Sequence, residues 1–165
     1  MKSGEYLLIK ATENNYDDYY KIRSEEKNLY WTGYEKAPQY ENFKAWFVDR
    51  LNNPLRDIYL MYINEKCVGS LHIDFYDDNV AIGYSVMKSY EGKGIGTRLV
   101  EEAVKIAKLS KLEGKNILRV KAWINFQNVG SIKVIEKNGF HLTKDTELKK
   151  RFGKEELYYI YALTI

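Results

Sequence analysis

A glycine-rich turn between a strand-like segment and a long amphipathic segment constrains the fold more than any other feature. Residues 80–87 (VAIGYSVM) are typical of a strand, the glycines follow at 92–96, and residues 95–112 are amphipathic. The apolar residues of the last segment share one helical face: Ile95, Leu99, Ala103, Ile106 and Ala107. The first amides of a helix have no partner within it, and glycine lets a phosphate approach the backbone closely. The stretch therefore predicts an anion-binding turn that opens a helix of about five turns.

Other glycine motifs fit this turn less well. A loop of the G-x-x-x-x-G-K-[ST] type needs a lysine followed by serine or threonine at its end, and no such pair stands at the required place. A dinucleotide-binding G-x-G-x-x-G starting at Gly92 would need glycine where the chain has Thr97. Two explanations stay open on these residues alone. The glycines can serve turn geometry only, or the turn can belong to a nucleotide-binding module that holds another phosphate.

The remaining segments complete a fold of alternating character. Further strands are predicted at 5–12, 57–63, 67–75, 117–124, 140–146 and 156–164, and helices at 15–27, 39–51 and after Asn128. An aromatic connection at 30–34 and a charged loop at 149–154 join some of them. The order is β-αα-βββ-α-β-α-ββ. Strand, helix and strand around residues 80–124 require a parallel crossover. We expect one α/β (α+β) domain over 1–165, with a mixed, mostly antiparallel sheet of about seven strands and helices on both faces.

Charge and cysteine usage exclude several function classes. The net charge of +3 is spread along the chain, whereas nucleic-acid binding favours a clustered basic face. No apolar run reaches the roughly 20 residues of a membrane span. Residues 1–5 lack the pattern of a secretory signal, so a cytoplasmic protein is expected. Cys67 is the single cysteine and is predicted to be a buried strand residue, and His72 and His141 lack metal-ligand spacing, so no metal is expected.

Two blocks of sequence resemble the GNAT superfamily of N-acetyltransferases. Glu91-Gly92-Lys93-Gly94-Ile95-Gly96 is similar to the family motif [RQ]-x-x-G-x-[GA], and residues 82–86 resemble the strand before it. Residues 128–131 followed by 136–140 resemble the N-x-x-[SA]…E-K-x-G-F block of the family. The N-terminal region resembles the ribosomal-protein N-terminal and amino-sugar acetyltransferase branches. The resemblance implies a GNAT-like fold and transfer of an acetyl group from acetyl-CoA directly to a primary amine, without a metal.

The resemblance also implies how the cosubstrate is held. Backbone amides grip the pyrophosphate at Gly92, Lys93, Gly94, Ile95, Gly96 and Thr97. The main chain at Tyr84, Ser85 and Val86 pairs with the pantetheine arm, and an amide there polarises the thioester carbonyl. Asn128 reaches the pantetheine from the other side of the cleft and caps the helix that follows it.

Two departures from the family pattern leave proton transfer unassigned. The tyrosine that many members use as an acid falls at Ile135, and the acidic residue that many use as a base falls at Ala81. The first motif position carries Glu91, whose carboxylate we expect to point to solvent because it would repel a pyrophosphate. These losses motivate an alternative function, a non-catalytic acyl-CoA binding or sensing domain.

The remaining candidates for acid and base are Tyr84, His72 and Asp74. Ser70, His72 and Asp74 share one face of the strand at 67–75 and form a polar stripe that can line a cleft. An ordinary hydrogen-bonded histidine or a solvated patch explains the same stripe.

The aromatic connection supplies the candidate acceptor residues, Tyr30, Trp31 and Tyr34. Aromatic faces suit sugar rings, bases or peptide side chains, although packing in the core or as a lid explains these residues equally well. The expected partner is a small-molecule amine, an amino sugar or a peptide N-terminus. Neither nucleic acid nor membrane is an expected partner, and a homodimer through an edge strand is compatible with the sequence.

Overall fold

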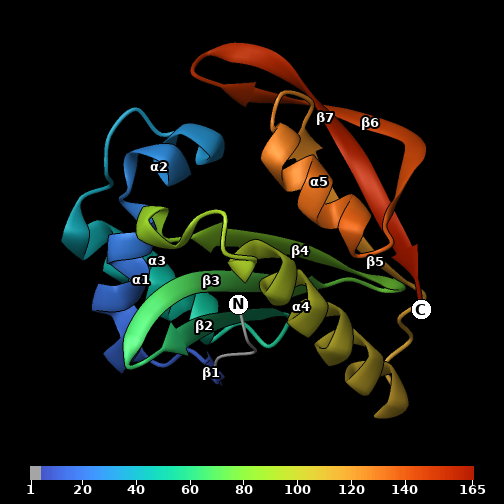
Figure 1. The fold of residues 1–165 in the computed structure, drawn as a ribbon, viewed down its shortest axis with the longest axis horizontal. Helices are drawn as coiled ribbons and strands as arrows, with labels where there is room; N and C mark the ends of the chain where they lie inside the picture. Colours follow the sequence, from blue (N-terminus) through green and yellow to red (C-terminus); the bar gives the residue numbers. More distant parts are fainter. Residues whose placement is uncertain (1–4) are drawn as a thin grey trace.

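A seven-stranded mixed sheet forms the middle of the computed structural model, which describes residues 5–165 (Figure 1). The expectation drawn from residues 1–5 concerns a segment of which residues 1–4 lie outside the described part. The strands are β1 (Tyr6–Lys10), β2 (Arg56–Ile63), β3 (Lys66–Phe75), β4 (Asn79–Val86), β5 (Arg119–Asn125), β6 (His141–Arg151) and β7 (Lys154–Thr164). They lie in the order β1-β2-β3-β4-β5-β7-β6, and only β4 and β5 are parallel. The predicted mostly antiparallel sheet with one parallel crossover is confirmed.

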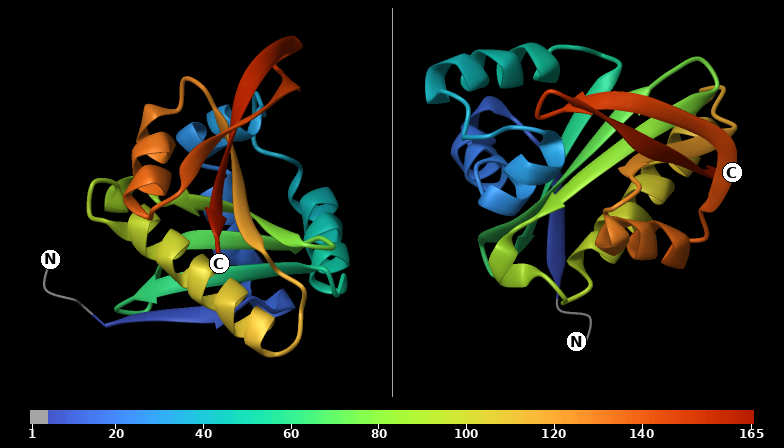
Figure 2. Two further views of the ribbon diagram at one scale, coloured as in Figure 1. Left: turned by 90° about the vertical axis from the view of Figure 1, so that its right-hand side faces the viewer. Right: turned by 90° about the horizontal axis from the view of Figure 1, so that it is seen from above.

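Within residues 5–165, five α-helices cover the two faces of this sheet. They are α1 (Tyr16–Arg23), α2 (Glu26–Thr32), α3 (Tyr40–Leu51), α4 (Ile95–Leu112) and α5 (Val129–Lys137). Short 3-10 turns precede α1 at Glu13–Asn15 and follow β4 at Lys88–Tyr90. Figure 2 shows the sheet between α4 on one side and α3 on the other. Helices on both faces were predicted, and this arrangement is confirmed.

The helix predicted at 15–27 is in fact two helices. Glu25 has extended backbone angles, and the side chain of Asn28 donates to the carbonyl of Ile22 at 2.9 Å, which satisfies a group at the end of α1. The second helix, α2, ends at Gly33, whose φ of 83° is easily adopted by glycine. Tyr30 and Trp31 therefore lie on a helix, and the prediction of an irregular connection at 30–34 was wrong.

Strand alternation divides the apolar residues into two cores. On β3, Leu71 and Ile73 are fully buried and pack with α4, whereas Ser70, His72 and Asp74 face α1 and α3. The core on that second side is aromatic and includes Tyr19 and Phe47, both with no exposed surface.

The sheet opens between β4 and β5. Their parallel pairing covers only Asn79–Ala81 of β4 and Arg119–Lys121 of β5. Beyond Ala81 the two strands diverge, as Figure 1 shows, so one edge of each strand runs on without a neighbouring strand. The opening gives the functional site its position.

The charged loop predicted at 149–154 is instead the end of a long hairpin. Strands β6 and β7 continue to a two-residue turn at Phe152 and Gly153, where φ is 52° and 74°. Lys149 lies opposite Glu156 and Lys150 opposite Glu155. These cross-strand pairs of opposite charge stabilise the hairpin in a segment whose charged composition had suggested a loop.

Three further expectations concern membranes, cysteine and metals. Within residues 5–165, no helix has both the length and the apolar character needed to span a bilayer. Cys67 lies on β3 and is partly buried, and burial raises the pKa of its thiol to about 12. Among the same described residues, no cluster of histidine, cysteine and acidic side chains is arranged to hold a metal ion.

Candidate active site

A cleft of about 570 Å³ lies in the opening between β4 and β5. Its walls come from β4, β5, the glycine turn, α2 and α5. Most of the predicted site residues line it: Tyr84, Ser85, Val86, Gly92, Gly94, Ile95, Gly96, Thr97, Asn128 and Trp31. The side chains of Tyr30 and Tyr34 are about half exposed and, like Lys93, they do not belong to its wall.

The glycine turn presents free amides to this cleft. Gly92 and Gly94 have φ of 69° and 80°, and a Cβ at either position would meet no atom within 4 Å. The first turn of α4 has no acidic residue, and no side chain caps its start at Gly94. The partial positive charge of the helix start is therefore uncompensated by neighbouring carboxylates. The geometry suits a pyrophosphate, as the resemblance implied.

Glu91 does not simply point to solvent. Its side chain is 35% exposed, and its carboxylate lies 2.7 Å from Nζ of Lys27 on α2. The ion pair neutralises the repulsion that the sequence alone would predict between a carboxylate and a bound phosphate. Lys93 lies nearby, with its Nζ 5.0 Å from the centre of the Tyr90 ring.

The free edge of β4 carries main-chain groups suited to an extended ligand. Ile82–Val86 have β3 on one side and the cleft on the other. The side chain of Asn28 donates to the carbonyl of Val86 at 3.3 Å, so α2 already satisfies one of these groups. An extended ligand can pair with this free edge of β4 as an additional strand.

Three side chains connect β4 with α5 at the cleft. The hydroxyl of Tyr84 donates to Oγ of Ser131 at 3.2 Å, and Oδ1 of Asn128 accepts from the Ser131 amide at 3.2 Å. The predicted helix cap at Asn128 is thereby confirmed. Burial raises the pKa of Tyr84, so its phenol keeps its proton at neutral pH. Sequence reasoning gave Ser131 no role, although the N-x-x-[SA] pattern contained it.

The other two acid–base candidates lie on the opposite face of β3 from α4, beneath α1 and α3. Nε2 of His72 is 2.8 Å from the hydroxyl of Tyr19, and Asp74 accepts from Arg50 at 2.5 Å. Burial first, and then neighbouring arginines, lower the pKa of His72, so its ring is neutral. Neither residue lines the cleft. The structure thus brings Tyr84 to the cleft and engages His72 and Asp74 in other contacts.

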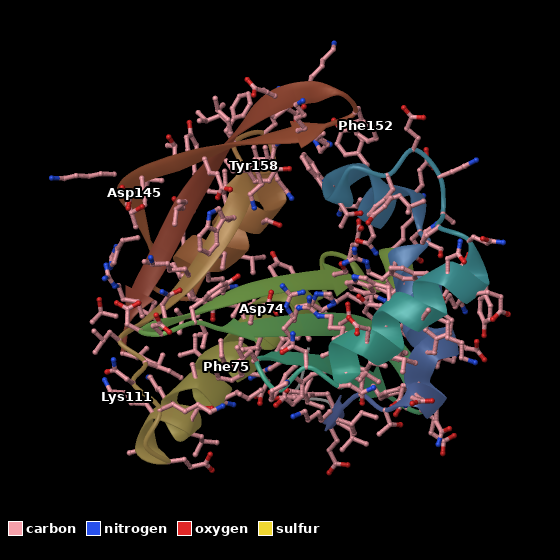
Figure 3. All side chains as sticks on the ribbon, turned by 180° about the vertical axis from the view of Figure 1, so that it is seen from behind. Asp74, Phe75, Lys111, Asp145, Phe152 and Tyr158 are labelled. Atoms are coloured by element: carbon pink, nitrogen blue, oxygen red, sulfur yellow. The ribbon has the colours of Figure 1, made fainter. Side chains whose placement is uncertain are left out.

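These two residues still border the opening from one side. In the register of β3 and β4, His72 lies opposite Gly83 and Asp74 opposite Ala81, and paired residues point to the same face of a sheet. Trp123 of β5 points to this face too, because its neighbours Ala122 and Ile124 belong to the opposite core. We call this face, defined by His72, Asp74, Gly83 and Trp123, the polar face. In Figure 3, Asp74 and Tyr158 of β7 lie on either side of the opening.

An arginine that sequence reasoning missed fastens the β6–β7 hairpin to α2. Arg151, which is 4% exposed, donates from Nε to Glu156 at 2.6 Å and from Nη1 to the carbonyl of Tyr30 at 2.7 Å. Asn125, a cleft residue, donates to the same carboxylate at 2.6 Å. Figure 3 shows Phe152 at the hairpin end beside α2. No short motif marks this cluster, because Arg151 and Tyr30 are 121 residues apart in the sequence.

The two departures from the family pattern are both accommodated in the structure. Ile135 is 1% exposed and belongs to the main core, so its position carries no proton donor. Ala81 forms the last β4–β5 pair, with Lys121.

Comparison with known proteins extends this picture. Residues 6–141 match the family model for the acetyltransferase (GNAT) domain. A Bacillus subtilis (strain 168) protein named probable N-acetyltransferase YjcK is 32% identical over 141 residues, which are 83% of this chain and 66% of that protein. The chain thus spans just under two thirds of that relative.

Solved structures share the fold at low identity. The acetyltransferase of Salmonella typhimurium that modifies the N-terminal serine of ribosomal protein L7/L12 matches with TM-score 0.81 and 17% identity, over 99% of this chain and 96% of that one. The ribosomal-protein-alanine N-acetyltransferase of Brucella melitensis matches with TM-score 0.78 and 21% identity, over 96% and 99%. The yncA protein of Salmonella typhimurium, solved with acetyl-CoA, matches with TM-score 0.73 and 18% identity, over 96% and 93%. Taken with the glycine turn and the open sheet, the family match shows that this chain belongs to the GNAT acetyltransferase family.

Proposed function

We propose that the protein transfers the acetyl group of acetyl-CoA directly to a primary amine. One observation carries the proposal: the glycine turn at the start of α4 and the free edge of β4 open into the same cleft. The turn suits a diphosphate and the strand edge suits the amide-containing arm that follows it. Family membership and a GNAT protein solved with acetyl-CoA support the same choice of cosubstrate.

The chain's own groups divide the work of holding the cosubstrate. Amides from Gly92 to Thr97 bind the pyrophosphate, the main chain of Tyr84–Val86 pairs with the pantetheine arm, and Asn128 approaches from α5. When bound, acetyl-CoA supplies an activated thioester for attack by the amine. A β4 amide directed at the thioester carbonyl stabilises the charge that develops there.

Tyr84 and Ser131 provide the proton for the departing sulfur. Ser131 donates its hydroxyl proton to the departing thiolate and recovers one from Tyr84, whose phenol is protonated before the reaction because its pKa is raised. The Tyr84 phenolate then regains a proton from the water that takes up the amine proton. His72 is a poor base, because its lowered pKa disfavours the protonated ring and Tyr19 occupies Nε2. The amine proton leaves through water at the open end of the cleft.

The acceptor is a small-molecule amine, an amino sugar or a peptide N-terminus. It approaches from the polar face, between α2 and the β6–β7 hairpin, where Trp31 and Asn125 line the cleft. One structural relative is named for modifying the N-terminal serine of a ribosomal protein and another is named as a ribosomal-protein-alanine N-acetyltransferase, which supports including peptides.

A second candidate function is a non-catalytic acyl-CoA sensor of the same fold. Ile135 and Ala81 favour it, since common acid and base positions carry hydrocarbon side chains. The Tyr84–Ser131 pair favours the enzyme, because it offers another route for the proton.

An acceptor screen tests the proposal. Purified protein is incubated with acetyl-CoA and a panel of amino sugars, polyamines and peptides, and free thiol is measured. We expect turnover with at least one class, and a fall in kcat of about a hundredfold in Ser131→Ala and about tenfold in Tyr84→Phe, with acetyl-CoA affinity kept. Tight CoA binding without turnover on any amine would favour the sensor. Preference for ATP or NAD over acetyl-CoA in calorimetry would refute both.

A further inference from the structure

Four buried side-chain atoms find no hydrogen-bond partner among residues 5–165, and each can donate: Nε of Arg23, Oγ of Ser24, Nε of Arg50 and Nε1 of Trp123. Unpaired donors of this kind are rare in folded proteins because each costs about 1–3 kcal/mol. Arg23 and Ser24 end α1, Arg50 lies near the end of α3, and Trp123 lines the cleft from β5.

The two arginines belong to one continuous cluster. The Arg23 guanidinium lies 6.0 Å from the centre of the Tyr19 ring, and the Tyr19 ring stacks on His72 with centres 5.7 Å apart. Tyr19 also stacks on Trp46 at 6.4 Å, and the Arg50 guanidinium lies 5.6 Å from the Trp46 ring.

This cluster adjoins the opening at Gly83. His72 is the register partner of Gly83, which is exposed, lines the cleft and leaves open space where a side chain would stand. Arg23 is the last residue of α1, and α2 begins at Glu26. The side chain of Asn28 on α2 donates to the Val86 carbonyl at the cleft. Neither arginine lines the cleft itself, and the cluster reaches the opening through His72, the register partner of Gly83.

Positive charge exceeds negative charge in the cluster. Asp74 is the carboxylate that Arg50 binds, so the partly buried Arg23 adds one cation, and Arg56, the register partner of Asp74, adds another that is exposed. Arg50 is 7% exposed, and burial is the largest cause of its lowered pKa. Asp74 opposes this shift, whereas the nearby Arg56 and Arg23 lower the pKa further. Buried or half-buried arginines beyond the number of carboxylates are costly unless an anion completes their contacts.

We propose that the acceptor amine carries a second, anionic group, a carboxylate or a phosphate, which Arg23 and Arg50 bind on the polar face. The inference rests on the proposed acetyl transfer and narrows its substrate class. Guanidinium matches the geometry of both anions, because it presents parallel N–H donors to paired oxygens. The amine then points across Gly83 toward the β4 edge.

Matched acceptor pairs test the charge requirement. One pair is phenylalanine and phenylalaninamide, the other glucosamine 6-phosphate and glucosamine. We expect kcat/KM to be about tenfold or more higher for the anionic member of at least one pair, and the pair that responds separates carboxylate from phosphate. Equal rates within both pairs, or faster transfer to the neutral members or to spermidine, would overturn the inference and leave acetyl transfer standing.

Substitution locates the effect. Arg23→Met is expected to reduce the preference for the anionic member about fivefold or more, with the neutral member changed less than about twofold. Arg119→Met removes an exposed arginine at the closed end of the opening and should preserve the preference. A preference that survives Arg23→Met, and also survives the double variant Arg50→Met with Asp74→Asn, refutes the assigned site.

A binding measurement separates the two proposals if no amine turns over. Failure of turnover would refute the proposed function, and binding then judges the anion site alone. N-acetylphenylalanine and its amide, and N-acetylglucosamine 6-phosphate and N-acetylglucosamine, are titrated into the CoA-loaded protein by calorimetry. Tighter binding of the anionic member of either pair by about tenfold supports the site, and equal binding within both pairs refutes it.

Discussion

The two sides of the cleft are built from different material. The cosubstrate side consists of main-chain groups: amides of a turn with glycine at positive φ, and the free edge of β4. The other side consists of the polar face on β3, β4 and β5 with the side chains of α1 and α3 that pack against it, and Arg151 fastens a hairpin to α2. We expect one side to recognise its ligand through backbone geometry and the other through side-chain chemistry.

The difference teaches which part of the site is free to change. Backbone recognition should tolerate most side chains, and Glu91, which pairs with Lys27, is an example of the variation that we expect to be allowed. Recognition on the other side should depend on the histidine of the polar face and on the arginine and tyrosine side chains that pack with it in an aromatic core. We therefore expect the acceptor to be decided by the packing of α1 and α3 rather than by the glycine turn.

The largest expected effect tests whether the polar face depends on that aromatic core. Phe47 has no exposed surface and stacks on Tyr19 with ring centres 4.9 Å apart. Phe47→Ala should lower the free energy of unfolding by about 3–5 kcal/mol, because it removes apolar contacts and leaves a cavity. Urea unfolding measures the change. The exposed Tyr76→Ala serves as control and should cost less than about 0.5 kcal/mol.

The second prediction tests backbone recognition on the cosubstrate side. Gly94→Asp places a negative charge beside the predicted pyrophosphate and should weaken acetyl-CoA binding tenfold or more, about 1.4 kcal/mol, by calorimetry. Gly94→Asn is the matched control, because asparagine tolerates the φ of 80° and adds no charge. If both variants bind acetyl-CoA like the wild type, the turn does not hold the pyrophosphate.

The same contrast explains what the sequence could predict. The strand, glycine turn and helix α4 are contiguous, so local pattern located the cosubstrate side and even the bounds of α4 at 95 and 112. The cap at Asn128 was local as well. The polar face was visible only as an alternating stripe, because its partners Tyr19 and Arg50 come from other elements.

Long-range pairing also explains the sequence predictions that were wrong. The charged residues at 149–154 were predicted to form a loop. In the structure each lysine at 149 and 150 lies opposite a glutamate of the partner strand, which the sequence segment alone does not reveal. The break between α1 and α2 depends on contacts that Asn28 makes with Ile22 and with Val86, the latter 58 residues away. No window of sequence contains such information.

The third prediction asks whether the hairpin positions the acceptor without affecting the cosubstrate. Arg151→Met removes the bonds to Glu156 and to the Tyr30 carbonyl. The acceptor KM should rise about fivefold, roughly 1 kcal/mol, with acetyl-CoA affinity unchanged. Arg151→Lys should recover only part of the loss, since lysine cannot form the two-pronged contact. An equal loss of acetyl-CoA affinity would mean that the two sides are not separate.

The smallest effect concerns the titration of the polar face. Folding lowers the pKa of His72 well below its ordinary 6.5, chiefly by burial, so below that pH the unfolded chain binds more protons than the folded one. Stability is therefore complete above pH 6.5 and falls as the pH falls. Between about pH 7 and pH 6 this contribution amounts to about 0.7 kcal/mol.

His72→Gln should remove this pH dependence, whereas the exposed His141→Gln should retain it, as measured by urea unfolding at each pH. If the stability of wild type and His72→Gln falls in parallel, the imidazole is accessible to protons in the folded state. The polar face would then be wetter than the contact with Tyr19 indicates, and the arginines beside it would need no anion to satisfy them. The outcome thus tests whether the side-chain-built side of the cleft is as dry as its contacts indicate, a question that does not arise for the backbone-built side.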